Sequence, residues 1–423
     1  MKKILLVLFV CSIVTAQQVT TVSGFAGAGY VDGSLANAKF SGPIGICADP
    51  TGTLYIADGN NYCVRKIDFS TGVVSTFAGT AVQGFADGSM ATAQFHSPGG
   101  ICMDSAGNLF VADRGNNKIR KIDVSTGMVS TFAGSTQGFA NGTGTSTKFN
   151  NPAGICIDSN DNLYVVEWGN NVVRKITPTR QVTTFAGSIN GFADGVGSAA
   201  KFATPMALCA DAQNTIFVAD TYNAKIRKIE PNGTVSTIAG STYGYLDGIA
   251  LTSQFSTTNG ICIDSNNNLY VTDNDRIRKI DLTNNVVSTY VGSLTGAYAT
   301  VDGEGNLALL SDPKGIGITA NDIIYFCQFG PCKIRKITSI LSTDNFVENS
   351  LQLYPNPNTG SFSINTVQNC SIVIYDLLGQ LVFTKKNLQS ENTLLETGLK
   401  KGGYLVCITS AEGKTTNQKM VIE

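Results

Sequence analysis

Histidine, tryptophan and charged residues are scarce in this chain of 423 residues, which contains one His, one Trp and only 14 % charged residues. A single imidazole cannot supply the several ligands of a histidine-based zinc site. The sequence also has no GxSxG nucleophile elbow, no phosphate-binding loop and no credible Ser-His-Asp set. The net charge of −1 provides no basic field, so we expect no nucleic-acid partner.

Long hydrophobic runs are absent apart from one at the N-terminus. Two lysines precede an apolar run from Ile4 to Val14, and the Val-Thr-Ala tripeptide that ends at Ala16 has the small-x-small pattern of a cleavage site. This arrangement predicts a secretory signal peptide over residues 1–16, cut after Ala16. The run is too short to anchor the chain in a bilayer. We therefore expect an exported protein with no transmembrane segment in the mature chain.

A helical apolar period is missing as well. Instead, the stretch from Gly100 to Gly134 contains four short runs rich in Ile, Val and Phe, separated by Gly, Asn, Asp and Ser clusters. Such runs predict four β-strands joined by tight turns. The expected strands are Gly100–Met103, Leu109–Ala112, Lys118–Ile122 and Met128–Phe132.

This four-stranded unit recurs along three quarters of the chain. Its third strand appears six times, at steps of 51 to 57 residues, as Val64–Ile67, Ile119–Ile122, Val173–Ile176, Ile226–Ile229, Ile277–Ile280 and Ile334–Ile337. One unit cannot bury both of its faces, so six units at near-constant spacing predict an all-β, six-bladed β-propeller. The sixth copy lacks a fourth strand, whereas Val19–Gly24 resembles one and precedes the first copy. We expect this N-terminal strand, residues 19–24, to close a propeller that spans residues 19–338.

The chain contains eleven cysteines, and nearly half of them follow the repeat. Five occupy the same place in successive copies and are therefore predicted to be small buried hydrophobes: Cys47, Cys102, Cys156, Cys209 and Cys262. Cys327 and Cys332 flank a turn and could close a hairpin by a disulfide. Cys63, Cys370 and Cys407 have no partner that the sequence alone assigns.

Strand direction alternates within a blade, so two kinds of loop emerge on one face: those joining second to third strands and those joining successive blades. We call this the long-loop face. The opposite face carries only tight turns. Because binding surfaces are usually built on long and varied loops, we looked for departures from the repeat on the long-loop face. An aromatic and arginine cluster there is typical of a recognition surface; its expected binding residues are Arg114, Glu167, Trp168, Tyr222 and Phe329. Scattered surface variation is the alternative.

Acidic residues also recur with the repeat. One set follows the first strand of each copy, at Asp49, Asp104, Asp158, Asp211 and Asp264; another follows the second strand, at Asp58, Asp113, Glu167, Asp220 and Asp273. A ring of carboxylates could hold calcium at the channel mouth. Because an active site on a symmetric ring should break the symmetry, we favour turn capping and ion pairs with the repeated arginines. We therefore expect no metal and no cofactor, and interpret His96 as a polar loop residue.

Two family resemblances complete the prediction. The motif GNLFVAD followed by N-x-x-IRKI, between Gly100 and Ile122, and its copy from Asn162 to Ile176 resemble NHL repeats. That resemblance implies a propeller with the first strand of each blade nearest the channel. Three segments, LYPNPNTGSFSI (Leu353–Ile364), IVIYDLLGQLV (Ile372–Val382) and LKKGGYLVCITSAEGKTTNQKMVI (Leu399–Ile422), resemble the C-terminal sorting domain of the type IX secretion pathway.

The sorting-domain resemblance implies a small β-sandwich over residues 351–423, joined by a linker, residues 339–350. It also implies handling by the type IX secretion machinery and release from, or attachment to, the outer cell surface. NHL-type propellers are mostly interaction scaffolds, so the predicted function is binding of an extracellular protein, glycan or small ligand. The alternative is an enzyme, a metal-dependent lactonase or lyase of the gluconolactonase-like class, since the fold alone does not choose a function.

Overall fold

The structure is a computed structural model that describes residues 15–341, 353–354, 361–364, 370–376, 380–388, 393–409 and 415–422. The chain divides into two compact units, Met1–Leu341 and Ser342–Glu423. Residues 1–14 of the expected signal peptide and residues 342–350 of the expected linker lie outside the described residues.

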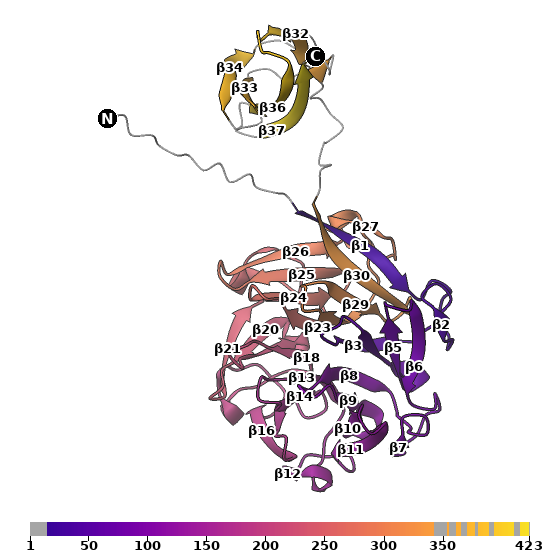
Figure 1. The fold of residues 1–423 in the computed structure, drawn as a ribbon. Helices are drawn as coiled ribbons and strands as arrows, with labels where there is room; N and C mark the ends of the chain where they lie inside the picture. The colour runs from indigo at the N-terminus through magenta and orange to yellow at the C-terminus, as the bar shows by residue number, and fades with distance from the viewer. Residues whose placement is uncertain are drawn as a thin grey trace. The chain divides into compact units, whose positions relative to one another are not determined.

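The first unit is a six-bladed β-propeller made of six five-stranded antiparallel sheets (Figure 1). The innermost strand of each blade contacts the inner strands of both neighbouring blades, so these six strands form a closed ring around the channel. The inner strands are β3 (Pro43–Ala48), β8 (Pro98–Met103), β13 (Pro152–Ile157), β18 (Pro205–Ala210), β23 (Thr258–Ile263) and β28 (Pro313–Ile318). The prediction of an all-β propeller is therefore confirmed.

Three further full strands extend each blade outward. The second strands are β4 (Leu54–Asp58), β9 (Leu109–Asp113), β14 (Leu163–Glu167), β19 (Ile216–Asp220), β24 (Asn268–Asp273) and β29 (Ile324–Gln328). The third strands are β5 (Cys63–Asp68), β10 (Lys118–Asp123), β15 (Val172–Ile176), β20 (Lys225–Ile229), β25 (Arg276–Asp281) and β30 (Lys333–Leu341). The fourth strands are β6 (Val73–Ala78), β11 (Met128–Ala133), β16 (Gln181–Gly187), β21 (Thr234–Ala239), β26 (Val286–Gly292) and, for the sixth blade, β1 (Thr15–Ser23).

A fifth, two-residue strand lies at the outer edge of every blade and was not predicted, because a pair of residues leaves no apolar run. These strands are β2 (Gly33–Ser34), β7 (Gly88–Ser89), β12 (Gly142–Thr143), β17 (Gly195–Val196), β22 (Gly248–Ile249) and β27 (Gly303–Glu304). Short 3-10 turns connect the strands: η1 (Gly59–Asn61), η2 (Arg114–Asn116), η3 (Gly144–Ser146), η4 (Gly197–Ala199), η5 (Thr221–Asn223), η6 (Ala250–Thr252) and η7 (Gly305–Leu307).

The ring is closed by the N-terminal strand. β1 pairs antiparallel with β30 over its whole length, with Val19 opposite Ile337, and on its other edge pairs with β27. Val19 is fully buried in the apolar cluster of the sixth blade. The two ends of the propeller chain therefore complete one sheet, which leaves the ring without an unpaired full strand.

Packing between blades forms the core. Between the second and third blades, Cys102 and Phe110 pack with Ile155 and Leu163, and each is less than one tenth exposed. Phe149, which precedes the inner strand of the third blade, is fully buried in the same cluster. Both faces of each blade are covered in this way, so the repeat must carry apolar residues on both faces of its strands.

The inner strands approach one another closely at a ring of glycines. A Cβ atom added to Gly260 would lie 2.2 Å from the Lys314 carbonyl oxygen, and one added to Gly315 would lie 2.1 Å from the carbonyl oxygen of Ile44. Only a residue without a side chain fits such a distance. The glycines therefore bring the six inner strands together at this level of the channel.

Each blade also contains a fully buried arginine on its third strand. In the second blade, Arg120 Nη1 donates to Asp113 Oδ2 at 2.8 Å and Nη2 donates to Asp87 Oδ1 at 2.7 Å. The guanidinium carbon lies 5.0 Å from the ring centroid of Phe85 and 5.1 Å from that of Phe95. The buried charge is therefore paired, hydrogen-bonded and covered by aromatic rings, as buried charge requires. Ion pairing with a buried arginine therefore accounts for the recurrence of these two acids in the repeat.

The corresponding pair in the first blade predicts an unusual dependence of stability on pH. Burial raises the pKa of Asp58 to about 6, although bonds from Asn61, the Ser41 backbone N–H and Arg65 favour the charged form. Since this pKa lies above the unfolded value of 3.8, the folded chain binds more protons, and stability is lost as pH rises from about 4 to 6. The melting temperature should therefore fall over this window in scanning calorimetry. A smaller slope for Asp58→Asn would support the assignment, and an unchanged slope would contradict it.

The cysteines of the propeller form no disulfide among the described residues. Four of the five repeated cysteines are buried and Cys47 is half-buried, and burial raises the pKa of the thiols of Cys102, Cys156 and Cys209 well above their usual range. Cys327 and Cys332 are both free, so they do not form the hairpin disulfide that their spacing allowed. The Cys332 thiol instead donates to backbone carbonyls of its own turn. Cys63 is buried and free, and the side chain of Cys370 lies outside the described residues.

The second unit is a small β-sandwich. One sheet has the order β31 (Leu353–Tyr354), β32 (Ser361–Ile364), β35 (Thr393–Glu396), and the other has the order β34 (Leu381–Leu388), β33 (Cys370–Asp376), β36 (Gly402–Thr409), β37 (Thr415–Ile422). Phe362 and Leu395 of the first sheet pack with Ile374 and Val406 of the second, and all four are buried. Cys407 lies in β36 opposite Val373. This arrangement confirms the predicted sandwich.

Candidate functional site

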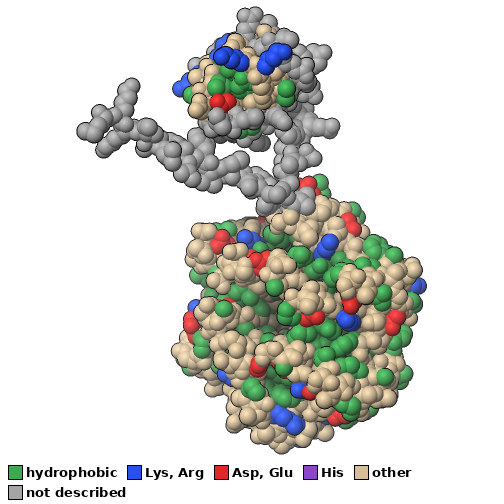
Figure 2. Space-filling view, viewed as in Figure 1, with side chains coloured by type: hydrophobic (Ala, Val, Ile, Leu, Met, Phe, Trp, Pro, Cys, Tyr) green, Lys and Arg blue, Asp and Glu red, His purple; other side chains and the backbone are tan. Residues whose placement is uncertain are grey.

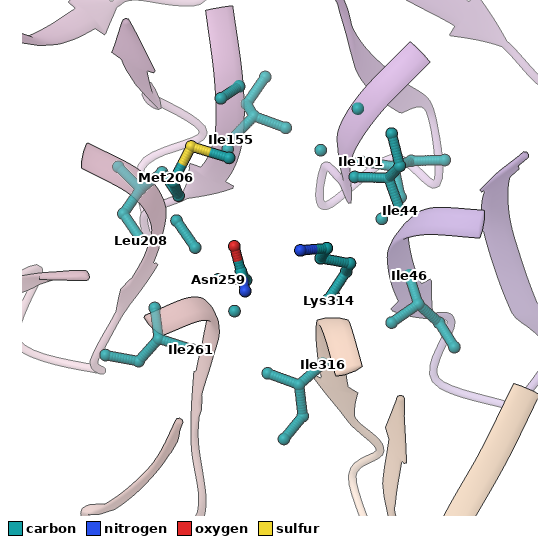
Figure 3. Close-up of a pocket in the computed structure, with 18 of the residues that line it drawn as sticks. Ile44, Ile46, Ile101, Ile155, Met206, Leu208, Asn259, Ile261, Lys314 and Ile316 are labelled. Atoms are coloured by element: carbon teal, nitrogen blue, oxygen red, sulfur yellow. The ribbon is translucent and has the colours of Figure 1, made fainter. Parts of the chain in front are cut away.

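The channel opens on the long-loop face into a cavity of about 100 Å³ (Figure 3). Its wall consists of the second to fourth residues of each of the six inner strands, together with Arg114, which follows β9. We call it the channel-mouth cavity. A concave site at the centre of the ring, lined by several blades at once, is the kind of place where small molecules bind.

Six equivalent residues, one from each blade, line this cavity, and all six differ. They are Ile44, Gly99, Ala153, Met206, Asn259 and Lys314. The position before them is proline in five of the six copies, and the position after them is glycine in five of the six. The propeller therefore repeats its backbone on both sides of a position whose side chain it varies in every blade.

Below this position lies an aliphatic ring. Two positions further along each inner strand, an aliphatic residue also lines the cavity and is less than one tenth exposed. These residues are Ile46, Ile101, Ile155, Leu208, Ile261 and Ile316. The floor of the cavity is therefore apolar over its full circumference.

Polar groups gather on one side of the cavity. Asn259 and Lys314 come from the neighbouring strands β23 and β28, and their side chains turn toward the middle of the cavity (Figure 3). Lys314 Nζ lies 2.7 Å from Asp312 Oδ1. Behind the two strands, Thr272 Oγ1 accepts the Gly260 N–H at 2.7 Å and donates to the Lys314 carbonyl at 2.9 Å. This hydroxyl fixes the backbones of both polar residues.

Arg114 brings a second positive charge to the cavity. Its Nη2 donates to Ser97 Oγ at 3.2 Å, and its guanidinium carbon lies 5.6 Å from the ring centroid of Trp168. Partial burial lowers the pKa of Arg114, but a guanidinium in a protein stays charged. No described carboxylate forms an ion pair with it. The arginine is thus held by a hydroxyl and an aromatic ring, which leaves its charge uncompensated.

The sequence predicted five binding residues on the long-loop face, and the structure brings two of them together, Arg114 and Trp168. Trp168 is 40 % exposed and Tyr222, on the fourth blade, is 76 % exposed. Phe329 is half-buried, with its ring edge against the backbone of Gly42. Of the five residues, only Arg114 lines the channel-mouth cavity.

Glu167 requires a correction, because it is fully buried and not exposed on the long-loop face. Its carboxylate accepts bonds from Arg174 and from the backbone N–H of Asn150. It takes the place that Asp113 has in the second blade, with one more methylene. Glu167 is therefore a structural partner of a buried arginine, which the sequence pattern of the second strand already indicated.

Sequence reasoning missed the residues that matter most for the cavity: Ile44, Met206, Asn259 and Lys314. It looked for variation in the loops after the second strands, where exposure was expected. The signal was present in the aligned repeats, since the residue between the recurring proline and glycine changes in every copy. The apolar pattern of the inner strands indicates packing, although residues near the start of each inner strand face the channel.

The two sets of repeated acids do not meet. Asp104, after the inner strand, caps the tight turn on the opposite face by accepting the backbone N–H of Asn108 at 2.7 Å. Asp113, after the second strand, is buried against Arg120. In the described part of the chain, no group of three or more His, Cys, Asp and Glu side chains is placed to hold a metal ion.

His96 lies in a loop, half-buried beside the second blade. Its Nε2 is 3.0 Å from Gln83 Nε2, and its backbone N–H donates to Asp113 Oδ1 at 2.8 Å. These contacts order the loop before β8, which agrees with the prediction of a polar loop residue.

Comparison with protein-family models identifies two families. The NHL repeat model matches residues 40–67, 95–122 and 149–176, which lie in the first three blades. The secretion system C-terminal sorting domain matches residues 352–423. No helix in the described residues is long and apolar enough to cross a membrane. The sorting domain marks a secreted or cell-surface protein handled by the type IX machinery.

Curated relatives share the propeller part of the chain. Human (Homo sapiens) NHL repeat-containing protein 2 is 29 % identical over 317 residues, covering 65 % of this chain and 43 % of the relative. Protein SUPPRESSOR OF QUENCHING 1, chloroplastic, from Arabidopsis thaliana is 29 % identical over 309 residues, covering 67 % of this chain and 29 % of the relative. The chain therefore spans less than half the length of these relatives.

Solved structures share the fold. A structural genomics protein of unknown function from Bacteroides thetaiotaomicron has a TM-score of 0.61 at 21 % identity, over 77 % of this chain and 76 % of that one. An auxiliary nutrient binding protein from Bacteroides ovatus has a TM-score of 0.59 at 14 % identity, over 77 % of both chains. These likenesses show the propeller fold alone. The matched repeats and the matched sorting domain identify the chain as an NHL-repeat β-propeller with a C-terminal sorting domain for type IX secretion.

Proposed function

We propose that this protein is a secreted or cell-surface binding protein that holds a small extracellular ligand in the channel-mouth cavity. The observation that carries the proposal is the break in symmetry at the cavity. Six equivalent positions differ in size and polarity, from Gly99 to Lys314, while the proline before and the glycine after them are repeated. Packing alone would favour the same residue in every blade, since each blade has the same neighbours.

The chemistry of the cavity supports binding. An apolar wall with a few polar groups on one side is typical of small-molecule sites, where the polar groups orient the ligand. The volume of about 100 Å³ is somewhat smaller than an apolar cavity of about 150 Å³ that binds benzene. The cavity therefore suits a small molecule or the end group of a larger one. The similar fold of auxiliary nutrient binding proteins from Bacteroides is compatible with this role.

The alternative, a metal-dependent lactonase or lyase, calls for acidic residues at the channel mouth. The residues that line the described cavity include two cations, Arg114 and Lys314, and no carboxylate. The repeated acids cap turns on the opposite face or pair with buried arginines. The observed lining therefore favours binding over metal-assisted catalysis in this cavity.

Filling the cavity tests the proposal. Ala153→Met places in the third blade the residue that the fourth blade already carries as Met206, so the change should be tolerated while it occupies the cavity. A panel of small molecules is screened for a rise in the melting temperature of the mature chain. We expect the shift produced by a true ligand to disappear in Ala153→Met.

Ala106→Met is the matched control, because Ala106 is exposed in a tight turn on the opposite face. This variant should keep the ligand-induced shift. A ligand whose shift survives Ala153→Met binds elsewhere and would contradict the proposed site.

A further inference from the structure

We propose that the channel-mouth cavity is a carboxylate site that takes a small monoanionic organic acid. Arg114 and Lys314 hold the carboxylate, and the aliphatic ring receives a short apolar chain. The inference rests on the proposed function and goes further by naming the chemical class of the ligand.

Arg114 is the first reason. The buried arginines of the blades are paired with carboxylates and carbonyls: both Nη atoms of Arg120, for example, donate to a carboxylate and to a backbone carbonyl. Arg114 has one hydroxyl partner, Ser97, and the face of Trp168. A planar guanidinium with free donors at the edge of a cavity matches the two oxygens of a carboxylate.

The charge balance is the second reason. Lys314 lines the cavity, and its charge is offset by Asp312, 2.7 Å away. Arg114 adds one positive charge that no described carboxylate offsets. The cavity and its immediate partners therefore carry one net positive charge, which suits a ligand with one negative charge. A dianion such as phosphate would meet the oxygens of Asp312 and leave charge uncompensated.

The apolar wall is the third reason. Arg114 belongs to the second blade and Lys314 to the sixth, so the first blade, with Ile44 at its mouth, lies between them in the ring. Beneath them the ring of Ile and Leu side chains surrounds the channel (Figure 3). A molecule with an ionised head and an aliphatic tail satisfies both parts of the cavity, whereas an inorganic anion leaves the apolar part empty.

The chain contains its own reporter of this binding. Trp168 is the only tryptophan of the 423 residues, and it stacks with Arg114. A ligand that draws the guanidinium toward the cavity changes the surroundings of the indole ring. Tryptophan fluorescence therefore reports on the arginine without any label.

The test uses four probes on the mature full chain: butyrate, 1-butanol, n-butylamine and inorganic phosphate. Calorimetry measures affinity and Trp168 fluorescence measures contact with Arg114. We expect butyrate to bind and to change the fluorescence, with 1-butanol and n-butylamine silent and phosphate weaker. Arg114→Met and Lys314→Met should each lower the affinity for butyrate about tenfold or more, since each removes a charge-assisted hydrogen bond. Arg114→Lys should lower it less.

Lys66→Met is the matched control. Lys66 pairs with Asp68 at 3.2 Å and is exposed to nearly the same extent as Lys314, but it lies on the third strand of its blade and does not line the cavity. Its replacement should leave butyrate binding unchanged. Circular dichroism of each variant establishes that the propeller is folded.

Three outcomes would overturn the inference. Equal binding of 1-butanol and butyrate would show a neutral apolar site, and tighter binding of phosphate would show a site for inorganic anions; in both cases the proposed binding function stands. Binding of none of the four probes would also reject the carboxylate site, and the Ala153→Met screen then decides the proposed function separately.

Discussion

Replacing Asp113 by alanine is expected to lower the free energy of unfolding by about 3 kcal/mol or more, because it leaves a buried charge without one of its partners. Arg120 is fully buried, as is Asp113, and the two are joined at 2.8 Å. Asp87, an exposed carboxylate, would remain paired with the guanidinium, which would also keep its bonds to the carbonyl groups of Ala86 and Gln94. These carbonyl groups carry partial charge only and cannot replace a carboxylate in a medium of low dielectric constant.

The chain itself varies this pairing in two blades. In the third blade, Asn141 replaces the exposed aspartate, while Glu167 retains the buried carboxylate. In the sixth blade, Gln328 replaces the buried acid, while Asp302 retains the exposed one at 2.8 Å from Arg335. Every buried arginine thus keeps at least one carboxylate. The loss of both in one blade, as in Asp87→Asn combined with Asp113→Asn, should cost more than the sum of the single changes.

Urea unfolding at constant m-value measures these losses. Asp123→Ala is the control, because Asp123 pairs with Lys121 at the surface, where ion pairs contribute little to stability. Because Asp123 also accepts the Ser125 hydroxyl at 2.7 Å and the Thr126 N–H at 3.1 Å in an exposed turn, we expect a loss of about 1 kcal/mol for this variant. A loss for Asp113→Ala as small as that of the control would show that the aromatic rings and carbonyls alone sustain the buried guanidinium.

Disrupting the closing strand should have a larger effect still. Val19→Asp introduces a carboxylate at a fully buried position between the fifth and sixth blades, opposite Ile337. The variant loses the burial of an apolar side chain, about 1.5–3 kcal/mol, and adds the cost of an unpaired buried charge. It also frees the edges of β30 and β27, which both pair with β1. We expect the chain to lose cooperative unfolding and to associate through its exposed strands.

Val129→Asp separates closure from local burial. Val129 has the same place on β11, the fourth strand of the second blade, and is 1 % exposed. Unlike β1, however, β11 is connected through the chain to the preceding strand of its own blade, β10. Both variants should be destabilised, and only Val19→Asp should form oligomers in size-exclusion chromatography, because only β1 is joined to its blade by pairing alone. Equal association of the two variants would show that the ring does not depend on this strand for closure.

The visible face of the propeller carries charged side chains of both signs. Acidic and basic side chains are scattered over the face shown in Figure 2, without a large patch of one sign in that view. This follows from the composition, since the charged residues of the repeat occur as pairs such as Lys121 with Asp123.

The sequence by itself determined the blades, their number and the strand that closes the ring. Each blade must bury the same two faces, so the apolar runs, the paired arginine and the Asp-Gly turns recur and can be recognised. The short outer strands could not be predicted, because each contains only two residues and no apolar run. The free state of Cys327 and Cys332 could not be predicted either, because these two cysteines do not recur with the repeat.

Only the tertiary structure decided the candidate site, the channel-mouth cavity. Ile44, Asn259 and Lys314 lie in three different blades and meet only because the ring closes. In the linear sequence each is one varied residue between repeated neighbours. Variation at that position indicates a binding site only when the six copies are known to face a common cavity. The placement of Arg114 beside Trp168 depends on the same closure. Chemistry at the axis of a ring is a property of the assembled blades, since no single repeat contains it.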